Sequence, residues 1–193
     1  MTLPAYVLAG GRSSRLGEDK ARAMLDDKTT VLQALVGSLD GRFSSWTAVA
    51  DRVDKYADLG IRTIADARSH RGPLGGILRA AIDAEPGYFF VTSCDRVGLR
   101  GQWVERLVAG LTEEPKAVSF VEEGRRQPLF AIYHTDLASI IERRLHDGQR
   151  AVWRLLEAVD AAAIEAPPGW EKTFSINRPR DLRRARRCFA APR

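Results

Sequence analysis

The amino-acid sequence predicts an α/β fold with a largely parallel sheet. Short strand-like segments alternate along the chain with segments whose apolar residues recur at helical spacing, and this alternation is typical of βαβ units. One strand, residues 88–92 (Tyr-Phe-Phe-Val-Thr), is apolar on both faces, as expected for the centre of a parallel sheet. Short connections that contain glycine or proline separate the elements.

The strands are expected where short apolar or β-branched runs lie between turn residues. They cover residues 5–8, 46–50, 62–65, 88–92, 117–121 and 130–133. Residues 159–170 have the weakest pattern, and because they contain Pro167-Pro168-Gly169 we expect an edge strand followed by a loop.

The helices are expected where apolar residues lie three and four positions apart. They cover residues 30–39, 74–84, 103–111, 137–145, 151–158 and 179–189. Pro179 suits the first position of the last helix, where its missing N–H is not needed. Trp103 and Trp153 each lie on a predicted helix and are interpreted as core residues.

Length and composition indicate one globular unit. The chain has 193 residues, of which 45% are hydrophobic, so we expect residues 1–193 to form a single domain. Its apolar runs are too short to cross a bilayer, and its first residues lack the pattern of a signal peptide. The only two cysteines, Cys94 and Cys188, suggest neither a disulfide framework nor a zinc site. A cytoplasmic protein without membrane contact is therefore expected.

The basic character of the chain is interpreted as a solvated surface. The net charge is +5, with 25 arginines and 5 lysines spread among 25 acidic residues. A small, multiply anionic substrate is the second explanation, and nucleic acid is not an expected partner because no reader motif occurs. The basic run 178–187 is also interpreted as a solvated face, although it could steer an anionic ligand or dock a partner. His70, His134 and His146 lack a ligand spacing and are expected in surface or loop positions.

The most informative segment is residues 8–20, Leu-Ala-Gly-Gly-Arg-Ser-Ser-Arg-Leu-Gly-Glu-Asp-Lys, directly after the first strand. Gly10 and Gly11 allow a sharp turn and a close approach to a ligand, and the N–H groups of such a turn can bind an anion. Arg15 and Lys20 bring two cations to the same place. The segment therefore predicts a loop that binds a polyphosphate.

Two other phosphate-binding motifs are excluded. The Walker motif ends in Gly-Lys-Ser/Thr, whereas Gly17 is followed by Glu18. The dinucleotide fingerprint needs Gly-x-Gly-x-x-Gly, which this segment lacks.

Two aspartates follow predicted strands. Asp95 comes after residues 88–92, and Asp66 comes after residues 62–65. Ligands of open α/β sheets bind beyond the carboxyl ends of the strands, so both carboxylates are expected beside the glycine loop. The competing interpretation of each is a structural aspartate in a turn or at a helix start.

The whole set of motifs resembles the molybdenum cofactor guanylyltransferase (MobA-like) family. Residues 8–20 match its signature Leu-Ala-Gly-Gly-x-Ser-x-Arg-Met-Gly-x-Asp-Lys except at Leu16. The other resemblances are to the family's Asp and Gly-Pro-Leu-x-Gly-Ile motifs, its Cys-Asp motif, its substrate-side strand and its closing Asn-x-Pro-x-Asp-Leu. They lie at residues 65–77, 93–95, 127–133 and 176–182. Together they span nearly the whole chain in the family's order.

The resemblance implies a three-layer α/β/α Rossmann-like nucleotidyltransferase fold with a mostly parallel sheet. It implies transfer of GMP from GTP to molybdopterin-bound molybdenum cofactor, forming the guanine dinucleotide cofactor and pyrophosphate with Mg²⁺. Proteins that insert or deliver the cofactor are implied as further partners. The alternatives are a relative that uses CTP, one that acts on a sugar or polyol phosphate, and a non-catalytic carrier of the cofactor. Retention of Arg15, Lys20 and Asp95 argues against the carrier.

The resemblance also assigns roles to residues. Arg15, Lys20 and Asp95 are the implied catalytic residues, and Asp95 is the implied metal ligand. Gln127 and Asn177 are implied on the acceptor side, and the alternatives for Asn177 are a contact with the phosphates or the metal, or a capping role. The nucleotide-binding residues are implied to be Leu8, Ala9, Gly10, Gly11, Lys20, Asp66, Gly72, Pro73, Leu74 and Asp95.

Two departures from the family pattern concern the acceptor more than the transfer chemistry. Asp95 is followed by Arg96-Val97-Gly98 in place of Met-Pro-Phe, which removes a rigid proline turn and is expected to put a third cation beside the metal site. Ser175 stands where the family often has the first asparagine of Asn-x-Asn.

Overall fold

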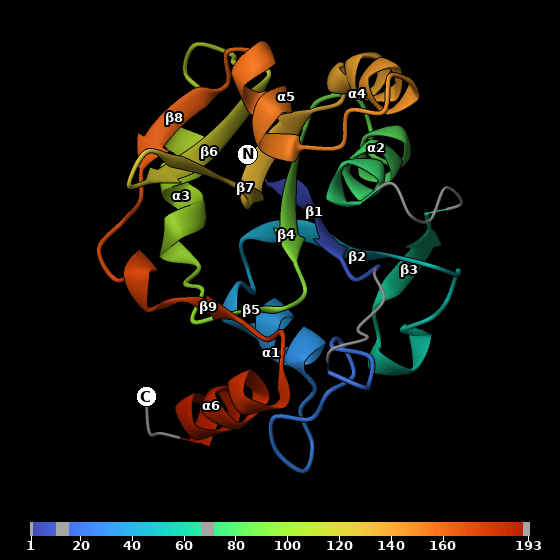
Figure 1. Cartoon of the computed structure of the whole chain (residues 1–193), viewed down its shortest axis with the longest axis vertical. Helices are drawn as coiled ribbons and strands as arrows, with labels where there is room; N and C mark the ends of the chain where they lie inside the picture. Colours follow the sequence, from blue (N-terminus) through green and yellow to red (C-terminus); the bar gives the residue numbers. More distant parts are fainter. Residues whose placement is uncertain (1, 11–15, 67–71, 191–193) are drawn as a thin grey trace.

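A seven-stranded sheet forms the centre of the protein in the computed structural model, which describes residues 2–10, 16–66 and 72–190 (Figure 1). The strand order is β3-β2-β1-β4-β7-β6-β8. The strands are β1 (Leu3–Leu8), β2 (Phe43–Ala50), β3 (Arg62–Ala65), β4 (Tyr88–Ser93), β6 (Ala117–Glu122), β7 (Arg125–His134) and β8 (Ala162–Glu165). The predicted strand segments are all confirmed. β8 is the expected edge strand, and a loop follows it.

Only β7 runs against the other strands of this sheet. It pairs antiparallel with β4 and with β6, whereas the remaining neighbours are parallel. The reversal follows from the two-residue turn between β6 and β7, in which Glu123 and Gly124 have φ values of 49° and 73°. Two successive positive φ values are the geometry of a tight hairpin turn. The sheet is therefore mostly parallel, as predicted.

Helices cover both faces of the sheet and make three layers (Figure 1). The apolar side chains of α1 and α3 share one core with β1, and those of α2, α4 and α5 share a second core with the opposite face. Alternation along β1 explains the division, because Ala5 and Val7 enter the first core and Tyr6 enters the second. The helices are α1 (Val31–Ser38), α2 (Pro73–Asp83), α3 (Gln102–Ala109), α4 (Leu137–His146), α5 (Val152–Ala158) and α6 (Pro179–Ala190).

The centre of the sheet is the predicted apolar strand. In β4, Phe89, Phe90 and Val91 are fully buried, and aromatic rings from neighbouring strands pack against them. A third apolar cluster joins α6 to the segment after the glycine loop through residues such as Leu16, Ile176 and Leu182. This cluster brings the end of the chain to the carboxyl edge of the sheet.

Trp153 corrects one prediction for the core. Trp103 is buried as expected, but Trp153 is 47% exposed, and the guanidinium of Arg154 lies 5.1 Å from its ring centroid. The short helix α5 buries Val152, Leu155 and Leu156, which leaves Trp153 on the opposite side.

The predicted surface groups lie largely as expected. His146 ends α4 with an 88% exposed side chain, and His70 lies outside the described residues. His134 differs, because it is the last residue of β7, its side chain is only 23% exposed, and its ring packs against Tyr88. The arginines of residues 178–187 are exposed along α6, which agrees with a solvated face. Within the described parts of the chain, no helix has the length and apolarity to cross a membrane.

Candidate active site

A cavity of about 770 Å³ opens at the carboxyl ends of the parallel strands. The loops after β1, β2, β3 and β4 all contribute to its wall, as expected for an open α/β sheet. Eight predicted site residues line it: Leu8, Ala9, Gly10, Lys20, Asp66, Gly72, Pro73 and Asp95. The predicted Gly11 and Arg15 lie outside the described residues.

Leu74 differs from the other predicted nucleotide-binding residues. Its side chain is fully buried in the core beneath α2, and it is not one of the cavity-lining residues in the described part of the chain. A leucine at the second position of α2 packs against the sheet because the first turn of the helix lies over it. Its side chain therefore serves the core.

Backbone hydrogen bonds align the loops at the edge of the sheet. The N–H of Ala9 donates to Val49 O over 2.9 Å, and the N–H of Asp66 donates to Ala50 O over 2.7 Å. The N–H of Cys94 donates to Leu8 O over 3.2 Å. The ladder thus continues one residue past β1, β3 and β4. It sets Ala9, Asp66 and Cys94, the residue before Asp95, side by side.

The start of α2 closes another side of the cavity. Gly72 precedes the helix with φ 69° and ψ −168°, a conformation essentially restricted to glycine, and Pro73 occupies the first turn of the helix. Gly72, Pro73 and Gly76 all line the cavity. The N-terminus of this 11-residue helix therefore contributes positive potential to a site for an anion.

Two predicted cavity residues, Lys20 and Asp95, meet a third predicted residue, the exposed Asn177, which is not among the cavity-lining residues of the described chain. The Lys20 ammonium donates to Asn177 Oδ1 over 2.6 Å and to Asp95 Oδ2 over 3.3 Å. The side chains of Lys20 and Asp95 are each 20% exposed. A cation, a carboxylate and an amide thus converge at this edge of the sheet, where they offer donors and acceptors suited to phosphate and a metal ion.

A small ribbon positions Asn177. β5 (Arg96–Val97) pairs antiparallel with β9 (Phe174–Ser175), and the N–H of Ile176 donates to Asp95 O over 2.9 Å. On the other side, the Asp181 carboxylate accepts from the N–H of Asn177 over 3.0 Å. The ribbon takes the place of the proline turn that the family pattern predicts after Asp95.

Arg96 does not stand beside Lys20 as a third cavity cation. Its guanidinium donates to Thr173 Oγ1 over 2.7 and 3.0 Å and to Gln127 Oε1 over 3.2 Å, and it lies 4.5 Å from the Trp170 ring centroid. Pairing of β5 with β9 directs the side chain to this side. The two predicted acceptor-side residues are therefore held separately, Asn177 by Lys20 and Gln127 by Arg96.

The residues present fit a hard divalent cation held mainly by its substrate. No group of three or more His, Cys, Asp and Glu side chains that could hold a metal occurs among the described residues. Mg²⁺ in nucleotide sites takes one or two carboxylates together with phosphate oxygens and water. Asp95 meets this need, since it lines the cavity and already faces the Lys20 ammonium.

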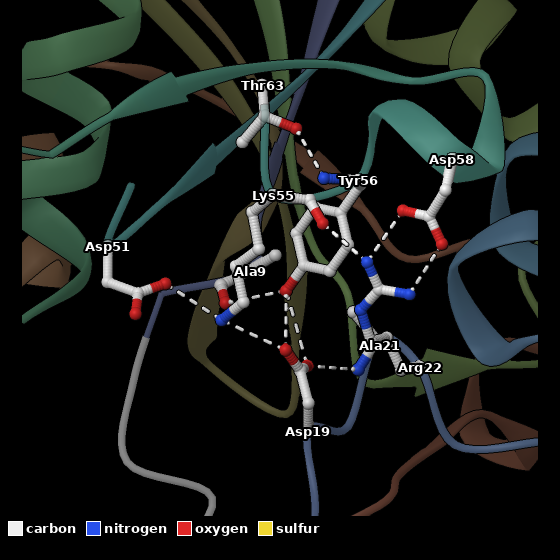
Figure 2. A network of polar contacts seen from close by, with 9 residues as sticks. All are labelled: Ala9, Asp19, Ala21, Arg22, Asp51, Lys55, Tyr56, Asp58 and Thr63. Atoms are coloured by element: carbon white, nitrogen blue, oxygen red, sulfur yellow. Dashed lines mark hydrogen bonds and ion pairs between the residues drawn. The ribbon is translucent and has the colours of Figure 1, made fainter. Parts of the chain in front are cut away.

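Reasoning from the sequence missed four residues of this region. Asp51 and Lys55 line the cavity, together with Asp19, and Tyr56 lies behind them (Figure 2). Asp51 directly follows β2, so the rule that selected Asp66 and Asp95 could have found it. Lys55 and Tyr56 lie within the connection from β2 to β3, where no periodic pattern marks them.

A mostly parallel three-layer sheet with a glycine loop, a lysine and a metal-suited carboxylate at its carboxyl edge defines a nucleotidyltransferase of Rossmann-like fold. Residues 5–163 match the family described as MobA-like NTP transferase domain. The chain belongs to this family.

Relatives with assigned names support the same placement. The chain is 35% identical over 189 residues to a probable molybdenum cofactor guanylyltransferase of Mycobacterium avium (strain 104), covering 95% of this chain and 94% of the relative. It is 28% identical over 191 residues to a protein of the same name from Peptoclostridium acidaminophilum, covering 93% and 86%.

Solved structures of low sequence identity share the fold. Molybdopterin-guanine dinucleotide biosynthesis protein A from Archaeoglobus fulgidus is similar with a TM-score of 0.79 and 23% identity, covering 97% of this chain and 99% of that one. The 2-C-methyl-D-erythritol 4-phosphate cytidylyltransferase from Thermus thermophilus has a TM-score of 0.73 and 15% identity, covering 99% and 100%. These similarities support the fold. They do not identify the nucleotide or the acceptor.

Proposed function

We propose that this protein is a molybdenum cofactor guanylyltransferase. It transfers GMP from GTP to molybdopterin-bound molybdenum cofactor and releases pyrophosphate. The observation that carries the proposal is the meeting of Lys20, Asp95 and Asn177 at the carboxyl edge of the sheet. The names of the full-length relatives favour GTP and the molybdopterin acceptor.

The reaction is an in-line displacement at phosphorus. A terminal phosphate oxygen of molybdopterin attacks the α-phosphorus of GTP, and the bond from that phosphorus to the bridging oxygen of the β-phosphate breaks. Such a transfer depends on positioning and on stabilisation of negative charge. Lys20 holds phosphate oxygens and offsets the charge that grows on the leaving pyrophosphate. Arg15 is the proposed second clamp.

The remaining cavity residues bind and orient the two substrates. The turn at Gly10 offers N–H groups to the phosphates, and Asp66 accepts hydrogen bonds from the nucleotide or helps to organise the metal site. Backbone groups at Gly72 and Pro73 contact the guanine. Asn177, which accepts from Lys20, is the proposed contact of the acceptor phosphate.

Mg²⁺ is the proposed cofactor, and Asp95 is its proposed protein ligand. When bound, the ion neutralises charge on the phosphate oxygens and polarises the α-phosphorus. Three further expectations stay predictions. Residues 1–193 are predicted to form a single domain. The enzyme is predicted to work in the cytoplasm without nucleic acid and to pass its product to insertion or delivery proteins.

The proposal is tested by the nucleotide dependence of pyrophosphate release. Purified protein is supplied with molybdopterin-bound molybdenum cofactor, Mg²⁺ and each of the four nucleoside triphosphates in turn. GTP is expected to support release and to give the guanine dinucleotide cofactor, identified by mass spectrometry. Activity with CTP and not GTP would refute the guanylyltransferase and favour a cytidylyltransferase.

A further inference from the structure

A partly buried hydrogen-bonded network holds Asp19, the residue before Lys20 (Figure 2). The Asp19 carboxylate accepts from the N–H of Ala21 over 3.0 Å, and its two oxygens lie 3.2 and 3.1 Å from the Tyr56 hydroxyl. The Lys55 ammonium lies 2.9 Å from Asp19 Oδ2. The same ammonium donates to Asp51 Oδ1 over 2.8 Å. Lys55 therefore bridges two carboxylates of the cavity.

The connection that carries Lys55 and Tyr56 is itself fixed. Tyr56 is fully buried in the core, and its N–H donates to Thr63 Oγ1 over 3.1 Å. Arg22 donates to Lys55 O over 2.5 Å and to both carboxylate oxygens of Asp58 over 2.8 and 2.7 Å. These hydrogen bonds thus tie the connection from β2 to β3 to the segment around Asp19.

Movement of Asp19 would move Lys20. The N–H groups of Arg22 and Ala23 both donate to Asp19 O over 3.0 Å, so residues 19–23 form one hydrogen-bonded turn. The Lys20 side chain extends from this turn to Asp95 and Asn177. Whether the Lys20 ammonium can contact Asp95 and Asn177 therefore depends on the position of this turn.

The charge of Lys55 suits an anchor better than a phosphate ligand. Burial alone would lower its pKa, but hydrogen bonds to Asp51 and Asp19 outweigh burial and raise the pKa above its ordinary value. An ammonium has three donors, and two of them already meet protein carboxylates. Without this cation, Asp19 and Asp51 would present two neighbouring negative charges to the cavity.

We propose that Lys55 is a positioning residue for Lys20. By bridging Asp19 and Asp51, it anchors the turn of residues 19–23 to the connection between β2 and β3 and keeps the Lys20 ammonium at Asp95 and Asn177. This role rests on the proposed function, in which Lys20 binds the phosphates of the nucleotide.

A double-mutant cycle tests the role, with Lys55→Met, Lys20→Met and both changes together. The readouts are kcat/KM for pyrophosphate release and the Kd for GTP with Mg²⁺ from calorimetry. Because misplaced groups reduce rates steeply, Lys55→Met is expected to lower kcat/KM by about 10- to 100-fold. In the Lys20→Met background the same change is expected to have no more than about a twofold effect, since coupled residues are not additive. Lys55→Arg, which can still bridge two carboxylates, is expected to recover most of the activity.

The matched control is Lys116→Met, which breaks the exposed ion pair of Lys116 with Asp136 outside the cavity wall. It is expected to leave kcat/KM unchanged. Thermal unfolding checks that each variant is folded. If Lys55→Met does not fold, Tyr56→Phe removes a different hydrogen bond to Asp19 and is expected to lower kcat/KM several-fold only when Lys20 is present.

Two results would overturn the positioning role. One is a Lys55→Met variant with wild-type kcat/KM. The other is an equal loss with and without Lys20, which would mean that Lys55 contacts the nucleotide itself. Failure of the proposed function is visible separately, because the unmodified protein would then release no pyrophosphate from GTP in the presence of molybdopterin-bound molybdenum cofactor and Mg²⁺.

Discussion

Asp95→Asn is expected to reduce catalytic activity much more than the stability of the fold. The change keeps the size of the side chain and removes the charge that faces Lys20. The two charged groups are 3.3 Å apart and each side chain is 20% exposed. A pair at that distance attracts by about 1.3 kcal/mol in water and about 5 kcal/mol at an effective dielectric constant of about 20.

The net effect on folding is expected to be much smaller than that attraction. Desolvation of both ions opposes it, and Lys20 keeps its hydrogen bond to Asn177. The amide oxygen of the new asparagine can also accept from Lys20. We therefore expect a loss of about 1 kcal/mol, which lowers Tm by roughly 2–4 °C in a chain of this length.

Activity is expected to fall far more than stability. Asp95 is the proposed protein ligand of the divalent ion, and loss of a group that stabilises developing phosphate charge costs about 3–4 kcal/mol, or roughly 10²- to 10³-fold in kcat. Pyrophosphate release at saturating GTP and Mg²⁺ measures kcat, and calorimetric unfolding measures Tm. Asp136→Asn is the control, since it neutralises the exposed partner of Lys116 and should leave kcat unchanged. Retention of more than a tenth of wild-type kcat by Asp95→Asn would refute Asp95 as the metal ligand.

Two further predictions concern the fold. Phe90→Ala empties a fully buried position in the central strand and is expected to lower the free energy of unfolding by about 3–5 kcal/mol. The control is Ile82→Ala, at a 60% exposed position, which should change this free energy by less than about 0.5 kcal/mol. Denaturant titrations measure both. Hydrogen bonds from Arg62 hold the pKa of Asp83 below its ordinary value against the opposing effect of burial, and Tyr6 adds to the lowering. Because the folded pKa is depressed, this stabilisation is present above about pH 4 and is lost as the pH falls through the folded pKa. Asp83→Asn should therefore reduce the Tm at neutral pH and flatten its decline in acid; an unchanged acid slope would contradict this.

Much of the fold follows from local patterns, and the exceptions have physical causes. The run at residues 88–92 predicts a central strand because an apolar pattern on both faces needs two covering layers. The reversed direction of β7 could not be read in the same way, because it depends on positive φ values at Glu123 and Gly124. β5 and β9 have two residues each, which is too short for any periodicity. Trp153 was misassigned because a seven-residue helix defines its buried face only through its neighbours.

The sequence predicts those site residues whose position follows from the strand order. It does not predict those whose position depends on tertiary contacts. Asp66 and Asp95 follow strands of a parallel sheet, and that order alone brings them to one edge. Asn177 meets Lys20 only through the ribbon of β5 and β9 and through the packing of α6, so its place came from the family resemblance. Lys55 neither follows a strand directly nor lies in a family motif. Its importance depends on two carboxylates that the fold brings to it.

The charges of the cavity explain why a metal ion belongs in the proposed reaction. Among the described residues, its wall carries four carboxylates, at Asp19, Asp51, Asp66 and Asp95, against the two ammonium groups of Lys20 and Lys55. Lys55 lies between two of those carboxylates, and Lys20 faces a third. A triphosphate of roughly four negative charges would meet this wall unfavourably if it entered without a cation. A divalent ion held by Asp95, as proposed, would turn one repelling carboxylate into part of a binding surface, and Gly10 and the start of α2, which also line the cavity, would add to it. Nucleotide and metal are therefore expected to bind together.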